Sequence, residues 1–142
     1  MQKKSIRIIN GKPFNYHTEP LFKSSNILNI HDQYTYNVLL FMQQFKLGIL
    51  PRSFNHLNYF TTRPEQPQTR QVGLANCSRP RTTYSSLLPY HKFPRIWNEL
   101  DTSSQNIQSI SSFKRKVKGT FINKYADVIH CNNTMCKQCY PQ

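Results

Sequence analysis

Apolar side chains recur at helical spacing between residues 31 and 47 of this 142-residue chain. This spacing would place an apolar stripe on one helix face, made by Tyr34, Val38, Phe41, Met42 and Phe45. Leu39 and Leu40 would widen the stripe. Asn29 suits the N-cap position, Asp32 stands where a capping-box acid would, and Gly48 suits the left-handed residue that ends a helix. The pattern predicts a helix over 31–47 that packs its stripe into a core.

Three further stretches have weaker helical signals. A helix near 19–26 would follow Thr18 as a cap and carry Leu21 and Phe22, and a helix near 51–58 would begin at Pro51. A helix over 110–125 would follow Ser109 as its N-cap and be weakened by Gly119, since glycine costs about 1 kcal/mol relative to alanine in a helix interior. Its apolar face would hold Ile110, Phe113, Val117 and Phe121, with Lys114, Arg115 and Lys118 turned away.

The middle of the chain, from Thr61 to Pro94, interleaves proline and arginine and shows little periodicity. Its segments best able to pair as short strands are Arg70–Leu74 and Thr82–Leu88. We expect Trp97 to pack against the helical core, with base stacking by Trp97, Tyr84 or Tyr90 as the alternative. The expected fold is therefore mainly α, with a small helical core and a long irregular Arg/Pro-rich middle.

Composition favours a segment of something larger over a self-sufficient domain. The apolar fraction of 37% is below the usual level for globular domains, so burial is marginal. The expected organisation is a basic N-terminal segment over 1–16, a helical domain over 17–125 and a Cys-rich tail over 126–142. The chain has no apolar run of membrane-spanning length and no apolar leader at its start, which predicts an intracellular protein, cytoplasmic or nuclear.

Charge is the strongest compositional signal, with 19 basic residues against 6 acidic ones and a net charge of +13. The basic residues gather in segments 1–12, 63–95 and 114–124, whereas 13–62 is close to neutral. Basic flanks around a neutral core favour contacts to a nucleic-acid backbone, which are electrostatic and independent of base sequence. The alternative is a solvated cationic surface that binds nothing.

A cysteine cluster near the C-terminus has the spacing of metal ligands. Cys136 and Cys139 are separated by two residues, and Cys131 is near enough to be a third ligand, so zinc is the expected metal. The fourth ligand would be Cys77 or, less favourably, His130. Free or disulfide-paired thiols are the alternative.

Catalytic chemistry of the common kinds is absent from the sequence. A polymerase needs clustered carboxylates to hold two metal ions, but the six acids are scattered and no two are adjacent. The chain also lacks a Gly-rich phosphate loop, a nucleophile elbow and an HExxH run. We therefore expect a protein that is not itself an enzyme.

Several short motifs stand in an order typical of one family. They are the run over 17–54, Thr69-Arg70, Arg81-Thr82, Trp97-Asn98-Glu99-Leu100, and Ser109 to Lys118 in the form S-x-x-S-F-K-x-x-x-K. In this order they resemble the C-terminal tail of non-LTR (LINE-type, Jockey-like) retrotransposon reverse transcriptases, downstream of the polymerase domain. The chain departs from that pattern at Asp101, where relatives often have proline.

The resemblance implies a segment that holds template RNA or target DNA beside the remainder of a reverse transcriptase. The basic residues expected to contact phosphates are Arg70, Arg79, Arg81, Arg95, Lys114, Arg115, Lys116, Lys118 and Lys124. A second hypothesis is a small interaction module whose stripe over 34–45 docks on a larger protein, which would leave Phe41, Met42 and Phe45 exposed in the isolated chain. A third is a truncated transposon copy without a selected role.

Overall fold

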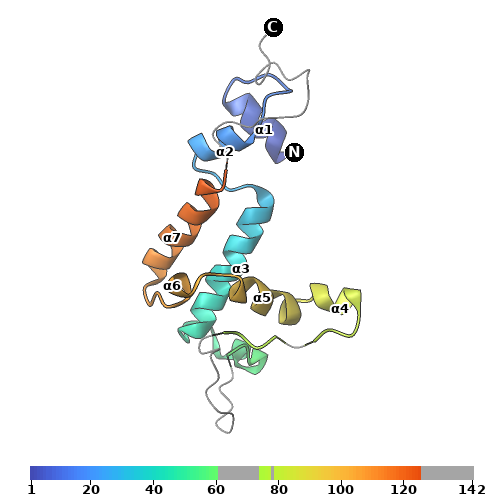
Figure 1. The fold of residues 1–142 in the computed structure, drawn as a ribbon, viewed down its shortest axis with the longest axis vertical. Coiled ribbons are helices and arrows are strands. Elements are labelled where there is room, and N and C mark those ends of the chain that lie inside the picture. Colours follow the sequence, from blue (N-terminus) through green and yellow to red (C-terminus); the bar gives the residue numbers. More distant parts are fainter. Residues whose placement is uncertain (61–73, 78, 126–142) are drawn as a thin grey trace. The chain divides into compact units, whose positions relative to one another are not determined.

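The structure, a computed structural model, describes residues 1–60, 74–77 and 79–125, and these residues are mainly helical with no strand among them, which confirms the expected fold class. The elements, drawn in Figure 1, are α1 (Gln2–Ile9), α2 (Glu19–Ser24), α3 (Ile30–Lys46), the 3-10 helix η1 (Arg52–Leu57), α4 (Thr83–Leu87), α5 (Pro89–Asn98), α6 (Thr102–Gln105) and α7 (Ile110–Asn123). The helices predicted near 19–26, 31–47, 51–58 and 110–125 correspond to α2, α3, η1 and α7.

The chain divides into two compact units, and the division runs through α3 and α7. Unit 1 comprises Met1–Tyr34 with Val117–Gln142, and unit 2 comprises Thr35–Lys116. In unit 1, α1 packs against α2, and in unit 2, α4 packs against α5. No helix in the described ranges combines the length and the apolar character needed to cross a bilayer.

The strand predicted over Thr82–Leu88 is wrong, because these residues form the cap and body of α4. The Thr82 hydroxyl accepts a hydrogen bond from the Ser85 N–H at 3.1 Å, which satisfies one of the free donors at a helix start. Of the other predicted strand, Arg70–Leu74, the structure describes Leu74 alone, which lies outside any helix. A side-chain cap thus outweighs the weak alternation of this stretch.

The end of α3 follows from Gly48, whose φ of +68° lies in the left-handed region. The Gly48 N–H donates to the Phe45 carbonyl at 3.1 Å and the Ile49 N–H donates to the Gln44 carbonyl at 3.0 Å, which is the Schellman pairing. Gly11 ends α1 in the same way, with a φ of +60°. The predicted role of Gly48 as a left-handed helix stop is confirmed.

Substitution by alanine should have opposite effects on the free energy of unfolding at Gly119, within α7, and at Gly48, just after α3. Gly119 lies within α7, and a methyl group there would meet nothing within 4 Å, so Gly119→Ala should raise the free energy of unfolding by about 1 kcal/mol. Gly48→Ala should lower it by about 1–2 kcal/mol, because an L-residue is strained at positive φ. Urea denaturation followed by circular dichroism measures both, and equal shifts of the same sign would contradict the assignment.

The start of α3 lies in unit 1 and is capped as the sequence predicts, with an unforeseen third partner. The Asn29 side-chain oxygen accepts from the backbone N–H of Asp32 at 3.0 Å. The Tyr125 hydroxyl accepts from the Asn29 N–H at 2.9 Å and donates to the Asp32 carboxylate at 2.6 Å. Tyr125 is itself buried, with its ring 6.1 Å from that of Phe22. In an ordinary capping box the acid itself accepts from the N-cap N–H. Here the Tyr125 hydroxyl lies between the two, because it accepts from Asn29 and donates to Asp32.

Burial and the hydrogen bond to Asp32 raise the pKa of Tyr125 to about 12. The folded-state pKa exceeds the ordinary value of 10.0, so the stability from this hydroxyl is complete below about pH 10 and is lost as the pH rises towards 12. Tyr125→Phe should lower the unfolding free energy at neutral pH by about 1–3 kcal/mol, since the Asn29 N–H loses its acceptor. The difference in unfolding free energy between wild type and variant, which we call the gap, should become smaller between pH 10 and 12.

Denaturation at pH 7, 10 and 11.5 measures this gap, with Tyr84→Phe as the control because Tyr84 is 76% exposed. A gap that stays constant with pH would argue against titration of Tyr125.

The core of unit 2 forms around Trp97, which is fully buried as expected. Its ring stacks on that of Phe113 at 6.1 Å and meets the edge of Phe60 at 5.6 Å. Of the predicted stripe on α3, Val38 and Met42 are buried and Phe41 and Phe45 half-buried, while Tyr34 is exposed. The exposed Met42 that the interaction-module hypothesis requires is not observed, since its exposed fraction is 0%.

Candidate nucleic-acid interface

The basic residues predicted to contact phosphates fall into both units. Unit 2 holds Arg79 and Arg81 ahead of α4, Arg95 on α5, and Lys114, Arg115 and Lys116 on α7. Unit 1 holds Lys118 and Lys124, and Lys124 lies over the Phe121 ring at 5.2 Å. Arg70 lies outside the described residues. The two units are described separately, so the interface is built here from unit 2.

Five of these residues in unit 2 have exposed side chains: Arg79, Arg81, Arg95, Lys114 and Arg115, which we term the open cations. Within the described part of the chain, none of the five forms an ion pair or a side-chain hydrogen bond. Their exposure follows from the helix faces: on α5, Trp97 is buried and Arg95 points away, and on α7, Phe113 is buried while the next two residues are not. Exposed charges of this kind remain available to a polyanion.

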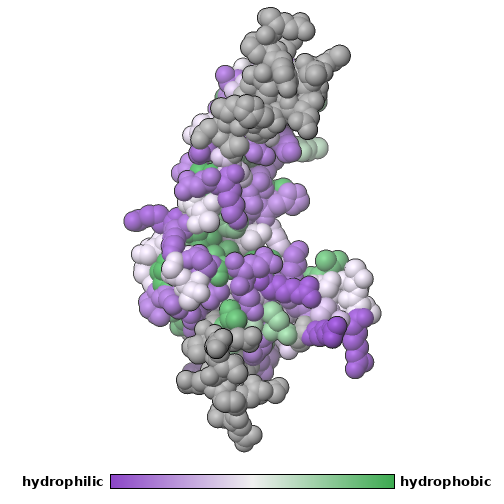
Figure 2. Space-filling view, viewed as in Figure 1, coloured by the Kyte–Doolittle hydropathy of each residue, from purple (hydrophilic) through white to green (hydrophobic). Residues whose placement is uncertain are grey.

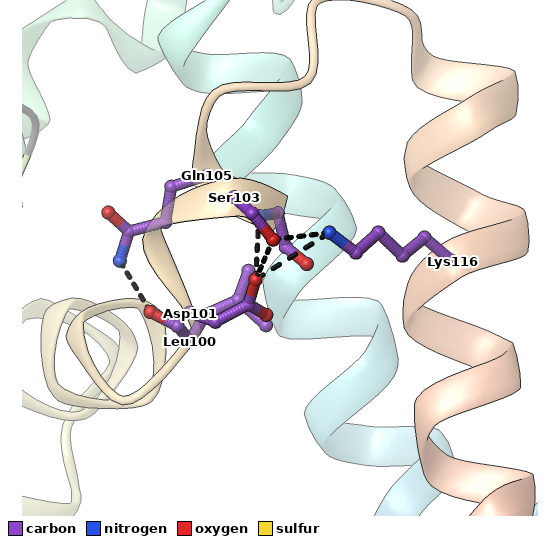
Figure 3. A network of polar contacts seen from close by, with 6 residues as sticks. Leu100, Asp101, Ser103, Gln105 and Lys116 are labelled. Carbon is purple, nitrogen blue, oxygen red and sulfur yellow. Dashed lines mark hydrogen bonds and ion pairs between the residues drawn. The ribbon is translucent and has the colours of Figure 1, made fainter.

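Lys116 differs from its neighbours because the chain itself binds it (Figure 3). Its ammonium donates to the Ser103 hydroxyl at 2.6 Å and lies 3.6 Å from the Asp101 carboxylate. Asp101 in turn accepts from the Ser104 N–H at 2.9 Å, which caps α6. The hydrogen bonds from Ser103 and Ser104, with a smaller contribution from Lys116, lower the pKa of Asp101 to about 2. The structure thus gives Lys116 an intramolecular role.

The role of Asp101 was not foreseen from the sequence. An N-cap signal was present, because an aspartate followed by Thr102, Ser103 and Ser104 is a common helix start. Asp101 is therefore both a helix cap for α6 and a partner for α7.

A second lysine, Lys46 at the end of α3, is also held within unit 2. Its ammonium donates to the Gln105 carbonyl at 2.8 Å and lies 5.7 Å from the centre of the Trp97 ring. Burial lowers the pKa of Lys46, which is the expected effect of desolvation on a cation. Gln43, one turn earlier, donates its side-chain amide to the Ile107 carbonyl. These contacts join α3 to the segment between α5 and α7.

Asn98, from the Trp-Asn-x-Leu motif, fixes an extended segment of the middle region. Its side-chain oxygen accepts from the Ala75 N–H at 2.8 Å and its amide donates to the Ala75 carbonyl at 3.0 Å. The Asn76 N–H donates to the Tyr59 carbonyl at 2.7 Å on the same segment. The motif residues Trp97 and Asn98 are therefore parts of the scaffold. They hold the chain at Ala75 in unit 2.

Unit 2 carries most of the charge imbalance, with eleven basic residues against three acidic ones, a net of +8. Two of the three acids, Glu99 and Asp101, are described, and Asp101 is paired with Lys116. Few carboxylates are thus placed to neutralise the open cations. In Figure 2, hydrophilic residues are spread over the coloured part of the face shown.

The predicted zinc ligands Cys131, Cys136 and Cys139 lie outside the described residues, so the zinc site stays a prediction. Cys77 is exposed, and its sulfur accepts from the Asn98 amide at 3.3 Å. Residues 1–60, 74–77 and 79–125 contain no group of three or more His, Cys, Asp or Glu side chains that could hold a metal ion.

Comparison of the chain with protein-family models, with curated proteins and with solved structures gives no match. The arrangement of the open cations is therefore the basis for the functional assignment that follows.

Proposed function

We propose that this protein is a non-catalytic C-terminal segment of a LINE-type reverse transcriptase that associates with template RNA or target DNA. The observation that carries the proposal is the set of open cations in unit 2, which have no ion-pair partner among the described residues. The ordered sequence motifs support the parentage, and the scattered acids support the absence of polymerase chemistry.

The chemistry of the open cations favours backbone contacts over base readout. Four of the five are on helices or next to a helix start, and their long side chains can reach phosphates without a fixed groove. Phosphate contacts supply affinity and register but carry no base sequence information by themselves. Binding should therefore be broad in sequence and strongly dependent on salt.

The interaction-module hypothesis receives less support from the same fold. Its proposed docking surface was the apolar stripe of α3, but Val38 and Met42 are buried within unit 2. A stripe that packs in its own core has little apolar surface to offer a partner.

The test is a salt titration with the full chain. Fluorescence anisotropy would follow binding to a labelled 20-nucleotide oligouridine and to a 20-base-pair DNA duplex between 50 and 200 mM KCl. If each open cation meets one phosphate of a single strand, the slope of log K against log salt should be about −3.5 or steeper, a loss of about a hundredfold in affinity.

Absence of binding to both probes at 50 mM KCl, or affinity that does not change with salt, would reject the proposal. Dextran sulfate, a polyanion without bases, added as competitor, would separate general polyanion binding from preference for nucleic acid.

A further inference from the structure

Unlike the other α-helices of unit 2, α4 buries none of its five residues. Tyr84 is 76% exposed and Leu87 is 62% exposed, although both are large side chains that a core would ordinarily bury. Figure 1 shows α4 beyond the start of α5, and Figure 2 shows hydrophobic and hydrophilic residues side by side over it. This helix therefore presents an aromatic ring to solvent, shortly after the open cations Arg79 and Arg81 in the chain.

Tyr90, at the start of α5, is a second exposed ring, and it packs against a buried aromatic ring. It is 49% exposed, and its inner side lies against Tyr59, with the ring centres 6.3 Å apart. Tyr59 is buried and lies parallel to Phe93 at 6.5 Å, so the ring of Tyr90 rests on a packed aromatic cluster. A ring backed in this way loses little conformational freedom when a ligand stacks on its outer face.

Tyr84 and Tyr90 lie in a stretch, the described residues between 74 and 98, in which every Asp, Glu, Lys or Arg is basic. Arg79, Arg81, Lys92 and Arg95 occur there, and no acid does. Positive charge interleaved with exposed aromatic rings is the composition of surfaces that bind single strands, where bases stack on the rings and cations follow the backbone. Bases in a duplex are already stacked on one another and cannot reach such rings.

We propose that α4 and the start of α5 form a single-strand binding surface, in which unpaired bases stack on Tyr84 and Tyr90 while Arg79 and Arg81 hold the adjoining phosphates. This inference rests on the proposed nucleic-acid association and adds to it the form of the ligand, a single strand of RNA or DNA. Charge complementarity selects this occupant over an apolar protein segment, because two arginines lie directly before the rings.

The test compares the double variants Tyr84→Ala/Tyr90→Ala and Tyr84→Phe/Tyr90→Phe in the full chain. Both keep the net charge, so the salt dependence should be unchanged, and only the first removes the rings. The alanine variant should bind the 20-nucleotide oligouridine about tenfold or more weakly, on the basis of about 1–3 kcal/mol per stacked base. The phenylalanine variant should bind as wild type does, and duplex affinity should change less than about twofold in either variant, by the same argument.

The single variant Tyr84→Ala separates a loss of stacking from a folding defect. Tyr84 is exposed and makes no ring contact among the described residues, whereas Tyr90 contacts Tyr59. It should show a loss on the single strand and a wild-type circular dichroism spectrum.

Three results would overturn the inference. Equal losses on single strand and duplex would show that the rings act through folding, and no loss on either would show that bases do not stack there. Release of a wild-type dimer by Tyr84→Ala, seen in sedimentation, would assign the surface to self-association. In each case salt-dependent binding by the wild type would leave the proposed function standing, whereas absence of all binding would reject both.

Discussion

Trp97→Ala is expected to lower the free energy of unfolding by about 3–5 kcal/mol, the range observed when a buried aromatic is cut to alanine. Trp97 is fully buried in unit 2 and contacts rings from two other segments, Phe60 and Phe113. Its loss would also remove the ring beneath the Lys46 ammonium. Small domains are stable by only about 5–15 kcal/mol, so the variant should lose a large share of that free energy.

Urea denaturation monitored by circular dichroism would measure the effect. Trp97→Phe is the matched variant, since it keeps an aromatic ring and should lose less. Tyr84→Ala is the surface control and should change stability little, because Tyr84 is exposed. A Trp97→Ala protein as stable as the Tyr84→Ala protein would mean that Trp97 does not organise the core.

Reversing two open cations, with Lys114→Glu/Arg115→Glu, is expected to weaken binding to the 20-nucleotide oligouridine by about a hundredfold at 50 mM KCl, if each residue meets one phosphate. Both side chains are exposed on α7, so the change should leave the helix intact. The slope of log K against log salt should become shallower by about 1.4, because two phosphate contacts disappear.

The matched control is Lys3→Glu/Lys4→Glu, which makes the same change in net charge at two exposed residues of α1 in unit 1. It should lose much less affinity than the α7 variant. Equal losses would indicate that binding follows the net charge of the protein and not the open cations. Circular dichroism spectra of both variants would establish that they are folded.

The helix with the strongest signal in the sequence was one with a long apolar period and a clear stop. α3 has both, since its stripe recurs over several turns and Gly48 ends it at positive φ. α5 could not be predicted in this way because Pro89 and Pro94 resemble helix breakers. Pro89 stands at the first turn, where proline is tolerated, and Pro94 is buried beside Trp97, so packing compensates for the lost hydrogen bond.

α1 and α4 escaped prediction for a different reason, which is that no helical signal was recognised in either segment, although the shorter α2 was predicted from Thr18, Leu21 and Phe22. Isolated helices this short are unstable in water, so tertiary contacts must stabilise them. α1 is held by tertiary contacts, in which the Gln2 side chain donates to the Leu28 carbonyl and accepts from the Ile30 N–H, both at 2.9 Å. α4 is held by the Thr82 cap and its packing on α5.

The sequence by itself determined the mainly helical fold, the caps at Asn29 and Gly48, the buried position of Trp97 and the excess of positive charge, because these depend on local spacing and composition. Only the tertiary structure decided which cations are committed to the fold. Lys46 and Lys116 are bound by Gln105 and Asp101, partners 59 and 15 residues away in the chain. Such pairings depend on how the helices pack, so a local sequence pattern does not predict them. The cations left over after that packing form the surface to which we assign nucleic-acid binding.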